Sequence, residues 1–475
     1  MAFAPDTRRA LIALAATLAT AAAAFYGTGM HPAWPMLWFA PLPMLVLAPR
    51  VSGRTSFALS AIAWFLGGMS MWTYFMSMLG RNPVPLTLVI LGVPSLVFAL
   101  GVVFFRWLLL RGHSIAAALA FPTVWTSYQY LSEITSLHST FGNLAYTQMN
   151  FLPILQIAAI TGIWGITFAL FAFSAAIATL LARPTRALAI GAAAFFVAVF
   201  GYGAWRLNTM PNANTVTVGL IASDLKENVD PQEPPDRLLR DYATHATKLA
   251  GNGAQVIVMP EKLAVVVDPE TRVQDAALQE VADRSKTDLV VGVIRVAKPV
   301  KYNEARVYTS GRTDVLAYDK QHMLPPWESK LTPGTTTAVM QKPSGTWGVA
   351  ICKDLDFPDL GRKYGKQGVG LMLVPAWDFE IDGWHHGRMS VLRGIESGYS
   401  IARAPKNGLL TVSDSRGRIL AEASSGASGF TTLLAKVPIH HESTLYLRFG
   451  DWFAWLVLAL LVTLLLVPFL RRAER

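Results

Sequence analysis

The single cysteine of the 475-residue chain, Cys352, has the sequence surroundings of a nucleophile. It follows the apolar run 347–351 and precedes a polar segment, so we expect it at a turn between a strand and a helix. At such a turn the N-terminal end of the helix would stabilise a thiolate, the reactive form of cysteine. Isolated cysteines are also common as small buried apolar residues, so Cys352 alone does not distinguish chemistry from packing.

Two other ionisable residues follow apolar, strand-like runs in the same way. Glu261 ends the run Val-Ile-Val-Met-Pro-Glu, and Lys320 follows the run that ends in Tyr-Asp. A thiol, a carboxylate and an ammonium are the groups that acyl transfer through a thioester requires. The thiol attacks, the carboxylate moves the proton and the ammonium stabilises the oxyanion. Glu261 or Lys320 alone would be read as an ordinary surface residue, but the three segments together predict a catalytic site.

The composition predicts that this site belongs to a membrane protein. Hydrophobic residues make up 52% of the chain and charged residues 15%, which is too apolar for a soluble enzyme alone. We predict a membrane domain over residues 1–207, a polar catalytic domain over 208–447, and a last span with a short tail over 448–475. The net charge of +10 comes largely from arginines near the apolar runs, so it predicts membrane orientation and not a nucleic-acid partner.

A bilayer-spanning helix needs roughly 20 apolar residues, and about eight runs approach that length. They cover residues 10–27, 33–49, 56–79, 86–110, 115–131, 153–182, 187–205 and 452–470. The run 33–49 contains three prolines and is expected to be broken, because a proline inside a helix removes a backbone hydrogen bond.

The positions of the arginines predict the orientation of these spans. With the N-terminus inside, the short external loops carry only Arg81. The cytoplasmic segments then carry Arg8, Arg9, Arg50, Arg54, Arg111, Arg183, Arg186, Arg471, Arg472 and Arg475. The domain 208–447 therefore faces outward. The first run also has features of a cleaved signal peptide, but its removal would leave that domain on the same side.

Within the polar domain, short β-branched segments alternate with amphipathic ones. Strands are predicted near 216–221, 255–258, 288–294, 370–375 and 409–413, and helices over 235–250, 273–285 and 386–397. A hairpin is expected to turn about Gly311. This alternation predicts a layered arrangement of helices and sheets.

The sequences of the three site segments resemble those of a known superfamily. Met259-Pro-Glu, Tyr318-Asp-Lys and Ile351-Cys-Lys-Asp, in this order, resemble the motifs of the nitrilase, or carbon-nitrogen hydrolase, superfamily. The membrane segments, including 121–127 and 138–146, are similar to those of the apolipoprotein N-acyltransferase family, so the resemblance covers nearly the whole chain. It implies a polytopic α-helical membrane bundle of about eight spans, carrying an extracytoplasmic αββα nitrilase-like sandwich domain. The implied location is the bacterial inner membrane, with the catalytic domain facing the periplasm.

The resemblance also assigns roles to residues of the site. Glu261 is the general base, Lys320 the oxyanion-binding lysine and Cys352 the nucleophile, with Glu328 and Asp354 as supporting residues. No metal or other cofactor is implied. The adjacent histidines 385 and 386 lack further ligands at a spacing that would predict a metal site.

The implied reaction moves an acyl chain from a phospholipid, through a cysteine thioester, to the N-terminal diacylglyceryl-cysteine of an apolipoprotein. Two departures from the family favour an alternative. Only residues 329–332 separate Glu328 from Pro333-Gly334, where the acyltransferases have a longer apolar lid, and Lys353 replaces the usual aromatic residue. A membrane-anchored amidase or nitrilase-like hydrolase would use the same residues with water as acceptor, and an acyltransferase with a different amine acceptor also remains open. A membrane scaffold without activity would not be expected to keep all three chemical groups.

Overall fold

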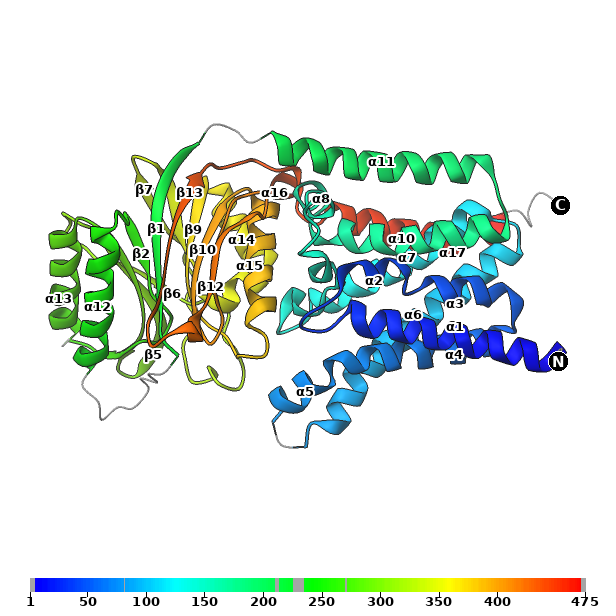
Figure 1. Ribbon diagram of the computed structural model, residues 1–475, viewed down its shortest axis with the longest axis horizontal. Helices are drawn as coiled ribbons and strands as arrows, with labels where there is room; N and C mark the ends of the chain where they lie inside the picture. Colours follow the sequence, from blue (N-terminus) through cyan, green and yellow to red (C-terminus); the bar gives the residue numbers. More distant parts are fainter. Residues whose placement is uncertain (1–4, 81, 210–212, 225–234, 270, 471–475) are drawn as a thin grey trace. The chain divides into compact units, whose positions relative to one another are not determined.

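The computed structural model describes residues 5–80, 82–209, 213–224, 235–269 and 271–470. The chain divides into two compact units (Figure 1). The first unit combines Met1–Asn208 with Asp451–Arg475, and the second consists of Thr209–Gly450. The first unit is therefore discontinuous in sequence, because the end of the chain returns to it.

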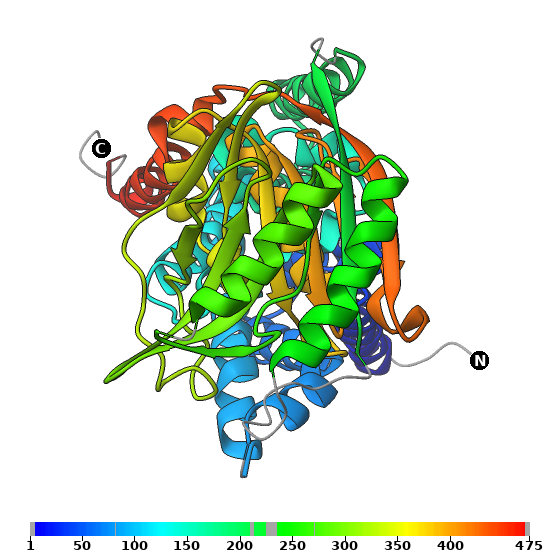
Figure 2. The same ribbon diagram turned by 90° about the vertical axis from the view of Figure 1, so that its left-hand side faces the viewer.

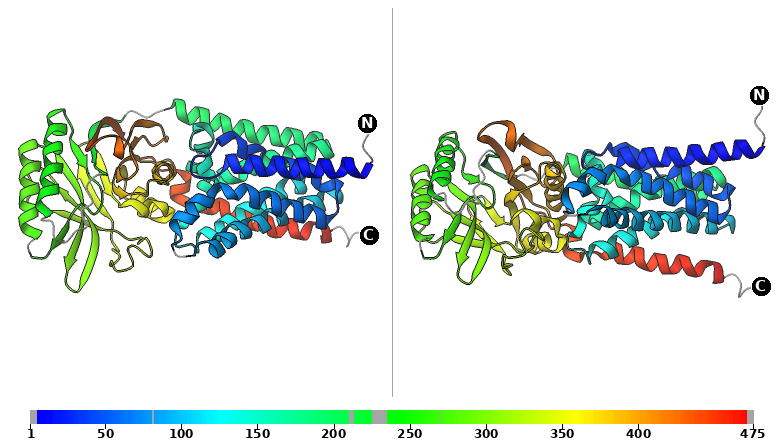
Figure 3. Two further views of the ribbon diagram at one scale, coloured as in Figure 1. Left: turned by 60° about the horizontal axis from the view of Figure 1, so that its bottom comes forward. Right: turned by 90° about the horizontal axis from the view of Figure 1, so that it is seen from below.

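The first unit is helical, and its long helices run side by side in both views of Figure 3. The long helices are α1 (Pro5–Gly27), α4 (Gly53–Gly68), α6 (Val84–Leu110), α7 (Ser114–Glu133), α10 (Ile163–Ala182), α11 (Arg186–Asn208) and α17 (Trp452–Leu470). Shorter helices lie between them: α2 (Trp34–Phe39), α3 (Leu42–Leu47), α5 (Trp72–Met78), α8 (Leu152–Leu155) and α9 (Ala158–Thr161).

Three of the predicted spans are interrupted. The run 33–49 forms α2 and α3 with a break before Pro41, as its prolines predict. The run 56–79 forms α4 and α5, and the run 153–182 forms α8, α9 and α10. Gly162 separates α9 from α10 with φ +66°, a left-handed conformation that stops the helical repeat and that glycine adopts without strain.

Among the described residues, four helices are long and apolar enough to cross a membrane. They are Thr7–Gly27, Val84–Leu110, Ile163–Ala182 and Arg186–Asn208. The apolar stretch Trp452–Leu466 of α17, in the last predicted run, is shorter. Large apolar side chains on α6, α11 and α17 are exposed, including Val89, Val197 and Leu456.

Aromatic packing and tryptophan hydrogen bonds hold the first unit together. Trp64 stacks on Phe98 with ring centroids 4.3 Å apart. The returning helix α17 is fixed by Trp455, whose Nε1 donates to the Tyr130 hydroxyl at 2.8 Å. Asp451, just before α17, accepts a 2.9 Å hydrogen bond from Nε1 of Trp164. These contacts explain why the C-terminal helix belongs to the first unit.

The second unit is an αββα sandwich of two packed sheets. The first sheet has the order β13 (Thr431–Ile439), β1 (Asn214–Ala222), β2 (Val256–Val258), β4 (Asp288–Ala297), β5 (Val300–Tyr308) and β6 (Leu316–Asp319), and β3 (Val265–Val267) also pairs with β4. The second sheet has the order β12 (Ile419–Ser424), β11 (Leu409–Ser413), β10 (Ser400–Lys406), β9 (Val369–Trp377), β8 (Gly345–Val349) and β7 (Ala338–Lys342).

Helices cover the outer face of each sheet. Figure 2 shows α12 (Pro235–Gly251) and α13 (Thr271–Ser285) in front of the first sheet. On the second sheet lie α14 (Pro358–Lys366) and α15 (Gly383–Ser397). The short helix α16 (Leu445–Phe449) packs against these two helices.

Alternation along the strands produces this layering. Val256 and Val258 of β2 are buried between the two sheets, whereas Ile257 belongs to the core under α12 and α13. On the neighbouring strand β4, Val290 and Leu289 divide between the two cores in the same way. Successive side chains of a strand point to opposite faces, so a continuous apolar run supplies both layers at once. The αββα architecture expected from the sequence is confirmed.

Candidate active site

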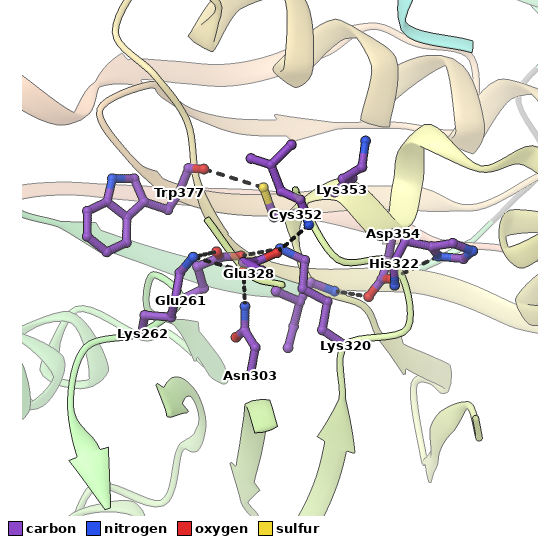
Figure 4. A network of polar contacts seen from close by, with 12 residues as sticks. Glu261, Lys262, Asn303, Lys320, His322, Glu328, Cys352, Lys353, Asp354 and Trp377 are labelled. Atoms are coloured by element: carbon purple, nitrogen blue, oxygen red, sulfur yellow. Dashed lines mark hydrogen bonds and ion pairs between the residues drawn. The ribbon is translucent and has the colours of Figure 1, made fainter. Parts of the chain in front are cut away.

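Three strand ends deliver the predicted site residues to one place, as Figure 4 shows. Glu261 follows β2, Lys320 follows β6 directly, and Cys352 follows β8. Strands β2 and β6 run in the same direction, because β2 is parallel to β4 and both β4 and β6 are antiparallel to β5. Their carboxyl ends therefore meet at the same edge of the first sheet.

Glu261 is held tightly by the backbone around it. Its backbone N–H donates to the carbonyl of Ala376 in the second sheet at 3.3 Å. On the other side lies Gly292 of β4, where a Cβ atom would come within 2.3 Å of Glu261 Cα. Only glycine fits there, so Gly292 permits the close approach that fixes Glu261.

Lys320 and Glu328 form a buried ion pair next to Glu261. The Lys320 Nζ atom is 2.8 Å from Glu328 Oε2 and 3.6 Å from Glu261 Oε2. Glu328 Oε1 also accepts a 2.8 Å hydrogen bond from the Asn303 side chain. All three ionised side chains are at most 2% exposed. Charges buried to this degree require close partners, and each one has them here.

A second lysine, Lys262, completes this cluster and was not predicted from the sequence. Its Nζ atom lies 2.9 Å from Glu261 Oε1 and 2.9 Å from Glu328 Oε1. Glu261 and Lys262 lie in a turn after β2, so the alternation of a strand does not set the directions of their side chains. Lys262 has φ +58°, and its side chain lies on the same side as that of Glu261. Its place next to Glu261 was the only signal in the sequence.

Cys352 adopts a strained backbone conformation at the start of the turn Cys352–Asp356. Its φ of +47° is left-handed, which is rare for a residue with a side chain and costs about 1–3 kcal/mol. The sulfur donates to the carbonyl of Trp377 at 3.4 Å, and the residue is 9% exposed. Such strained residues persist only where the surrounding contacts hold them.

Asp354 supplies those contacts and links the turn of Cys352 to the loop of Lys320. Its Oδ2 accepts hydrogen bonds from the Ile351 N–H at 3.1 Å and the Tyr318 hydroxyl at 2.8 Å. Its Oδ1 accepts from the backbone N–H groups of Gln321 at 3.1 Å and His322 at 2.9 Å. Asp354 is fully buried and bonds both to Ile351, next to Cys352, and to the backbone just after Lys320. It is therefore placed to position both segments.

The Cys352 thiol is neutral at rest. Burial is the main reason that its pKa rises to about 12, and the nearby Glu261 raises it further while Lys320 opposes the rise. The segment after Cys352 is a single 3₁₀ turn of five residues, Cys352–Asp356, followed by the short helix α14. A neutral thiol needs a base before it can attack.

The ion pair beside the thiol stays charged. Burial opposes the ionisation of Glu328, but Lys320 and Lys262 outweigh it and lower the pKa of Glu328 to about 2. Burial also opposes the charge of Lys320, but Glu261 and Glu328 outweigh it and raise the pKa of Lys320 above its ordinary value. A fixed ammonium therefore faces the thiol at neutral pH.

Further buried charges flank Cys352 on the side of the second sheet. Arg403 NH1 donates to Asp378 Oδ2 at 2.7 Å. His386 lies 3.5 Å from Asp356 and 3.4 Å from Asp382. Burial opposes protonation of His386, yet these two carboxylates raise its pKa to about 10. In the described part of the chain, no group of three His, Cys, Asp or Glu residues is arranged to hold a metal ion.

The short segment 329–332, where the family resemblance implies a longer lid, is tied to the site. The Thr332 N–H donates to the Lys301 carbonyl at 2.7 Å, and the Gly334 N–H donates to the Lys320 carbonyl at 2.8 Å. A Cβ atom on Gly334 would lie 2.2 Å from the Asp319 carbonyl oxygen, so only glycine passes there. Just before this segment, the exposed Trp327 contacts Phe379 with ring centroids 5.2 Å apart.

Comparisons with known proteins place both units in known classes. The family model described as Carbon-nitrogen hydrolase matches residues 221–442. The model described as Apolipoprotein N-acyltransferase N-terminal domain matches residues 15–176. Among solved structures, an amidase from Nesterenkonia sp. aligns at 19% identity with a TM-score of 0.43, over 52% of this chain and 97% of that one. The match of the family model to residues 221–442 assigns the second unit to the carbon-nitrogen hydrolase class.

Curated relatives extend over almost the entire chain. An apolipoprotein N-acyltransferase of Geobacter metallireducens is 25% identical over 90% of this chain and 89% of its own length. The enzyme of that name from Haemophilus influenzae is 24% identical over 92% of each chain. Together with the two domain matches, this similarity shows that the chain belongs to the apolipoprotein N-acyltransferase family.

Proposed function

We propose that the protein is an apolipoprotein N-acyltransferase that works through a thioester on Cys352. It takes an acyl chain from a phospholipid and transfers it to the N-terminal diacylglyceryl-cysteine of a lipoprotein. One observation carries this proposal. A single chain joins the N-terminal domain of this acyltransferase family to a domain in which a buried neutral thiol meets a carboxylate and an ammonium.

In the first half-reaction Glu261 acts as general base. It accepts the proton of the Cys352 thiol as the sulfur attacks the ester carbonyl of the phospholipid and a sulfur–carbon bond forms. The Lys320 ammonium stabilises the negative oxygen of the tetrahedral intermediate. The ester carbon–oxygen bond then breaks, Glu261 returns the proton to the leaving glycerol oxygen, and lysophospholipid departs. The raised pKa of Cys352 supports the need for this base.

In the second half-reaction an amine replaces the thiol. The α-amine of the diacylglyceryl-cysteine attacks the thioester carbonyl and passes a proton to Glu261. The sulfur–carbon bond breaks, an amide forms, and the sulfur recovers the proton from Glu261. Glu328 and Asp354 act as supporting residues, because Glu328 holds Lys320 and Asp354 holds the turn of Cys352.

We further propose that residues 1–207 form a membrane domain, residues 208–447 the catalytic domain, and residues 448–475 the last span and a cytoplasmic tail. The exposed apolar side chains of α6, α11 and α17 support lipid contact, because soluble surfaces rarely present such continuous apolar faces. The distribution of arginines supports about eight spans in the bacterial inner membrane, with the catalytic domain on the periplasmic side.

A second candidate function is favoured by a specific observation. The segment 329–332 is short, and its last residue, Thr332, is bonded to the Lys301 carbonyl, so less apolar chain is present above the site to exclude water. A membrane-anchored carbon-nitrogen hydrolase would form the same thioester and discharge it to water, and another acyltransferase would discharge it to a different amine.

Labelled phospholipid tests the proposal directly. The purified protein is expected to acquire a hydroxylamine-labile acyl group on Cys352, absent from Cys352→Ala. This acyl-enzyme should persist in detergent and discharge quickly when a diacylglyceryl-cysteine peptide is added. Decay at the same rate with and without the peptide, together with turnover of a small amide, would favour the hydrolase. No labelled Cys352 at all would contradict the thioester chemistry.

A further inference from the structure

Lys262 contacts only one of the two carboxylate oxygens of Glu261. Its Nζ atom lies 2.9 Å from Oε1 of Glu261. The other oxygen, Oε2, is buried and has no hydrogen-bond partner among the described residues, although Lys320 approaches it to 3.6 Å. A buried carboxylate oxygen without a hydrogen-bond donor lowers the stability of the fold. A general base, however, needs such an oxygen free to receive a proton.

We propose that Lys262 is a positioning residue of the reaction, which anchors Glu261 through Oε1 and so reserves Oε2 for the proton of Cys352. This inference rests on the proposed function in giving Glu261 the role of base. Neither the sequence motifs nor the expected set of Glu261, Lys320 and Cys352 includes this second lysine.

The charges of the cluster show why one lysine is not enough. Glu261 and Glu328 are both buried, and the described contacts give them two ammonium partners, Lys262 and Lys320. Without Lys262, two buried carboxylates would share one ammonium, and the excess negative charge would favour binding a proton. Lys262 therefore keeps the base ready to accept.

Contacts around Lys262 connect it to the nucleophile. Its ammonium lies 5.2 Å from the ring centroid of Trp377, a cation–π contact. The carbonyl of the same Trp377 accepts the hydrogen bond from the Cys352 thiol. The side chain of Lys262 is 19% exposed, whereas Lys320 is 2% exposed. Lys262 is thus the lysine of this cluster nearest to solvent, and a substitution there disturbs the buried oxyanion lysine least.

Lys262→Met keeps most of the length of the side chain and removes its charge, and Lys262→Arg keeps the charge. Lys342→Met is the matched control. Lys342 is 15% exposed, pairs with Asp288 at 2.5 Å and lies 5.5 Å from the Trp347 ring centroid, so the same kinds of contact are lost outside the site. For each variant, the rate of acyl-enzyme formation from labelled phospholipid is measured as a function of pH.

For Lys262→Met we expect a loss of roughly 10- to 100-fold in this rate at neutral pH. We also expect the acid side of the pH–rate profile to move to higher pH, because the base is protonated more readily. Lys262→Arg should restore the position of the acid side, and Lys342→Met should match the wild type. If Lys262→Met formed acyl-enzyme more slowly but its pH–rate profile did not move, Lys262 would have only a structural role. That result would overturn the inference.

Alkylation of Cys352 by iodoacetamide separates this inference from the proposed function. The sulfur forms a bond to carbon, iodide leaves and Glu261 takes the thiol proton, so no phospholipid is needed. If the wild type formed no acyl-enzyme, the proposed function would fail, yet the alkylation profile of Lys262→Met should still shift to higher pH. An identical alkylation profile in the wild type and Lys262→Met would overturn the role of Lys262 whatever the donor.

Discussion

At the scale of single residues, the central feature is the buried, neutral thiol of Cys352, the nucleophile of the proposed reaction. Cys352 lies among buried charges, and its pKa of about 12 means that almost no thiolate exists at neutral pH. Reactivity therefore depends on proton transfer to a neighbouring carboxylate at the moment of attack. A thiol in this state would resist adventitious oxidation, because oxidants react with the thiolate.

Replacing Cys352 tests this arrangement most simply. Cys352→Ala and Cys352→Ser should both lower acyl transfer by about 10⁴-fold or more. Alanine removes the nucleophile, and the serine hydroxyl is a far weaker nucleophile beside the same base. Release of labelled lysophospholipid measures the loss. Size-exclusion profiles and thermal unfolding should match the wild type, since neither change leaves a large cavity. Near-normal activity in Cys352→Ala would contradict a thioester mechanism.

The Glu328 carboxylate gives a pH dependence with a defined sign. Its pKa is lowered from 4.5 to about 2, so its contribution to stability is present above pH 4.5 and is lost as the pH falls toward 2. Glu328→Gln should therefore be less stable than the wild type by about 3 kcal/mol near neutral pH. The gap should close toward pH 2, because the protonated carboxyl resembles the amide. Thermal unfolding in detergent from pH 7 to pH 2.5 measures this gap, and a gap independent of pH would contradict the ionic role.

Much of the candidate site could be predicted at this scale, but not all of it. Glu261, Lys320 and Cys352 could be singled out because each follows an apolar run, and strand ends gather at sheet edges. Lys262 could not, because its direction depends on a backbone angle that no periodicity reveals. Asp378, just after β9, and Arg403 of β10 form a buried pair, and only the pairing of these two strands brings them together.

At the scale of elements, the site depends on how two loops are joined. Asp354 accepts hydrogen bonds from the turn of Cys352 and from the loop of Lys320, so the proposed nucleophile and the proposed oxyanion-binding lysine share one buried anchor. Because the anchor lies beneath the site and not in it, its loss should disturb geometry without removing a reacting group.

Asp354→Asn should therefore lower acyl-enzyme formation while the protein still folds. The amide nitrogen cannot accept, which leaves donors such as the Tyr318 hydroxyl and the Ile351 N–H without their shared acceptor, at about 1–3 kcal/mol each. Asp359→Asn is the matched control. Asp359 is an exposed residue of α14 paired with Lys363 at 3.8 Å, and its loss should change stability by less than about 0.5 kcal/mol. Equal activities of the two variants would contradict the anchoring role.

The elements themselves were predicted unevenly, and the reason is physical. Strands β1, β4 and β9 are buried on both faces, so their continuous apolar runs are visible in the sequence. Strand β13 alternates between buried and exposed residues and pairs with β1, more than 200 positions earlier in the chain. An edge strand with a polar face gives little signal, and its partner is fixed only by the folded topology.

At the scale of the whole molecule, the predicted topology is testable with reporters. Fusions near residues 112 and 185 and at the C-terminus should report the cytoplasm, and fusions within 210–445 should report the periplasm, because the arginine-rich loops fall on one side. Alkaline phosphatase and green fluorescent protein activities provide opposite readouts for each position. A cytoplasmic signal from 210–445 would contradict the proposed orientation and the supply of lipoprotein substrate from the periplasm.

The discontinuity of the first unit has a consequence for biosynthesis. Helix α17 is the last part of the first unit to leave the ribosome, after the whole second unit, Thr209–Gly450, has been made. At about 5–20 residues per second, this delay lasts roughly 10–50 s. During this delay, Tyr130 and Trp164 of the first unit lack Trp455 and Asp451, their later hydrogen-bond partners. A chain that stops before residue 451 would therefore have a complete second unit and an incomplete helical unit. Quality-control proteases should recognise such a chain by the missing hydrogen-bond partners of Tyr130 and Trp164.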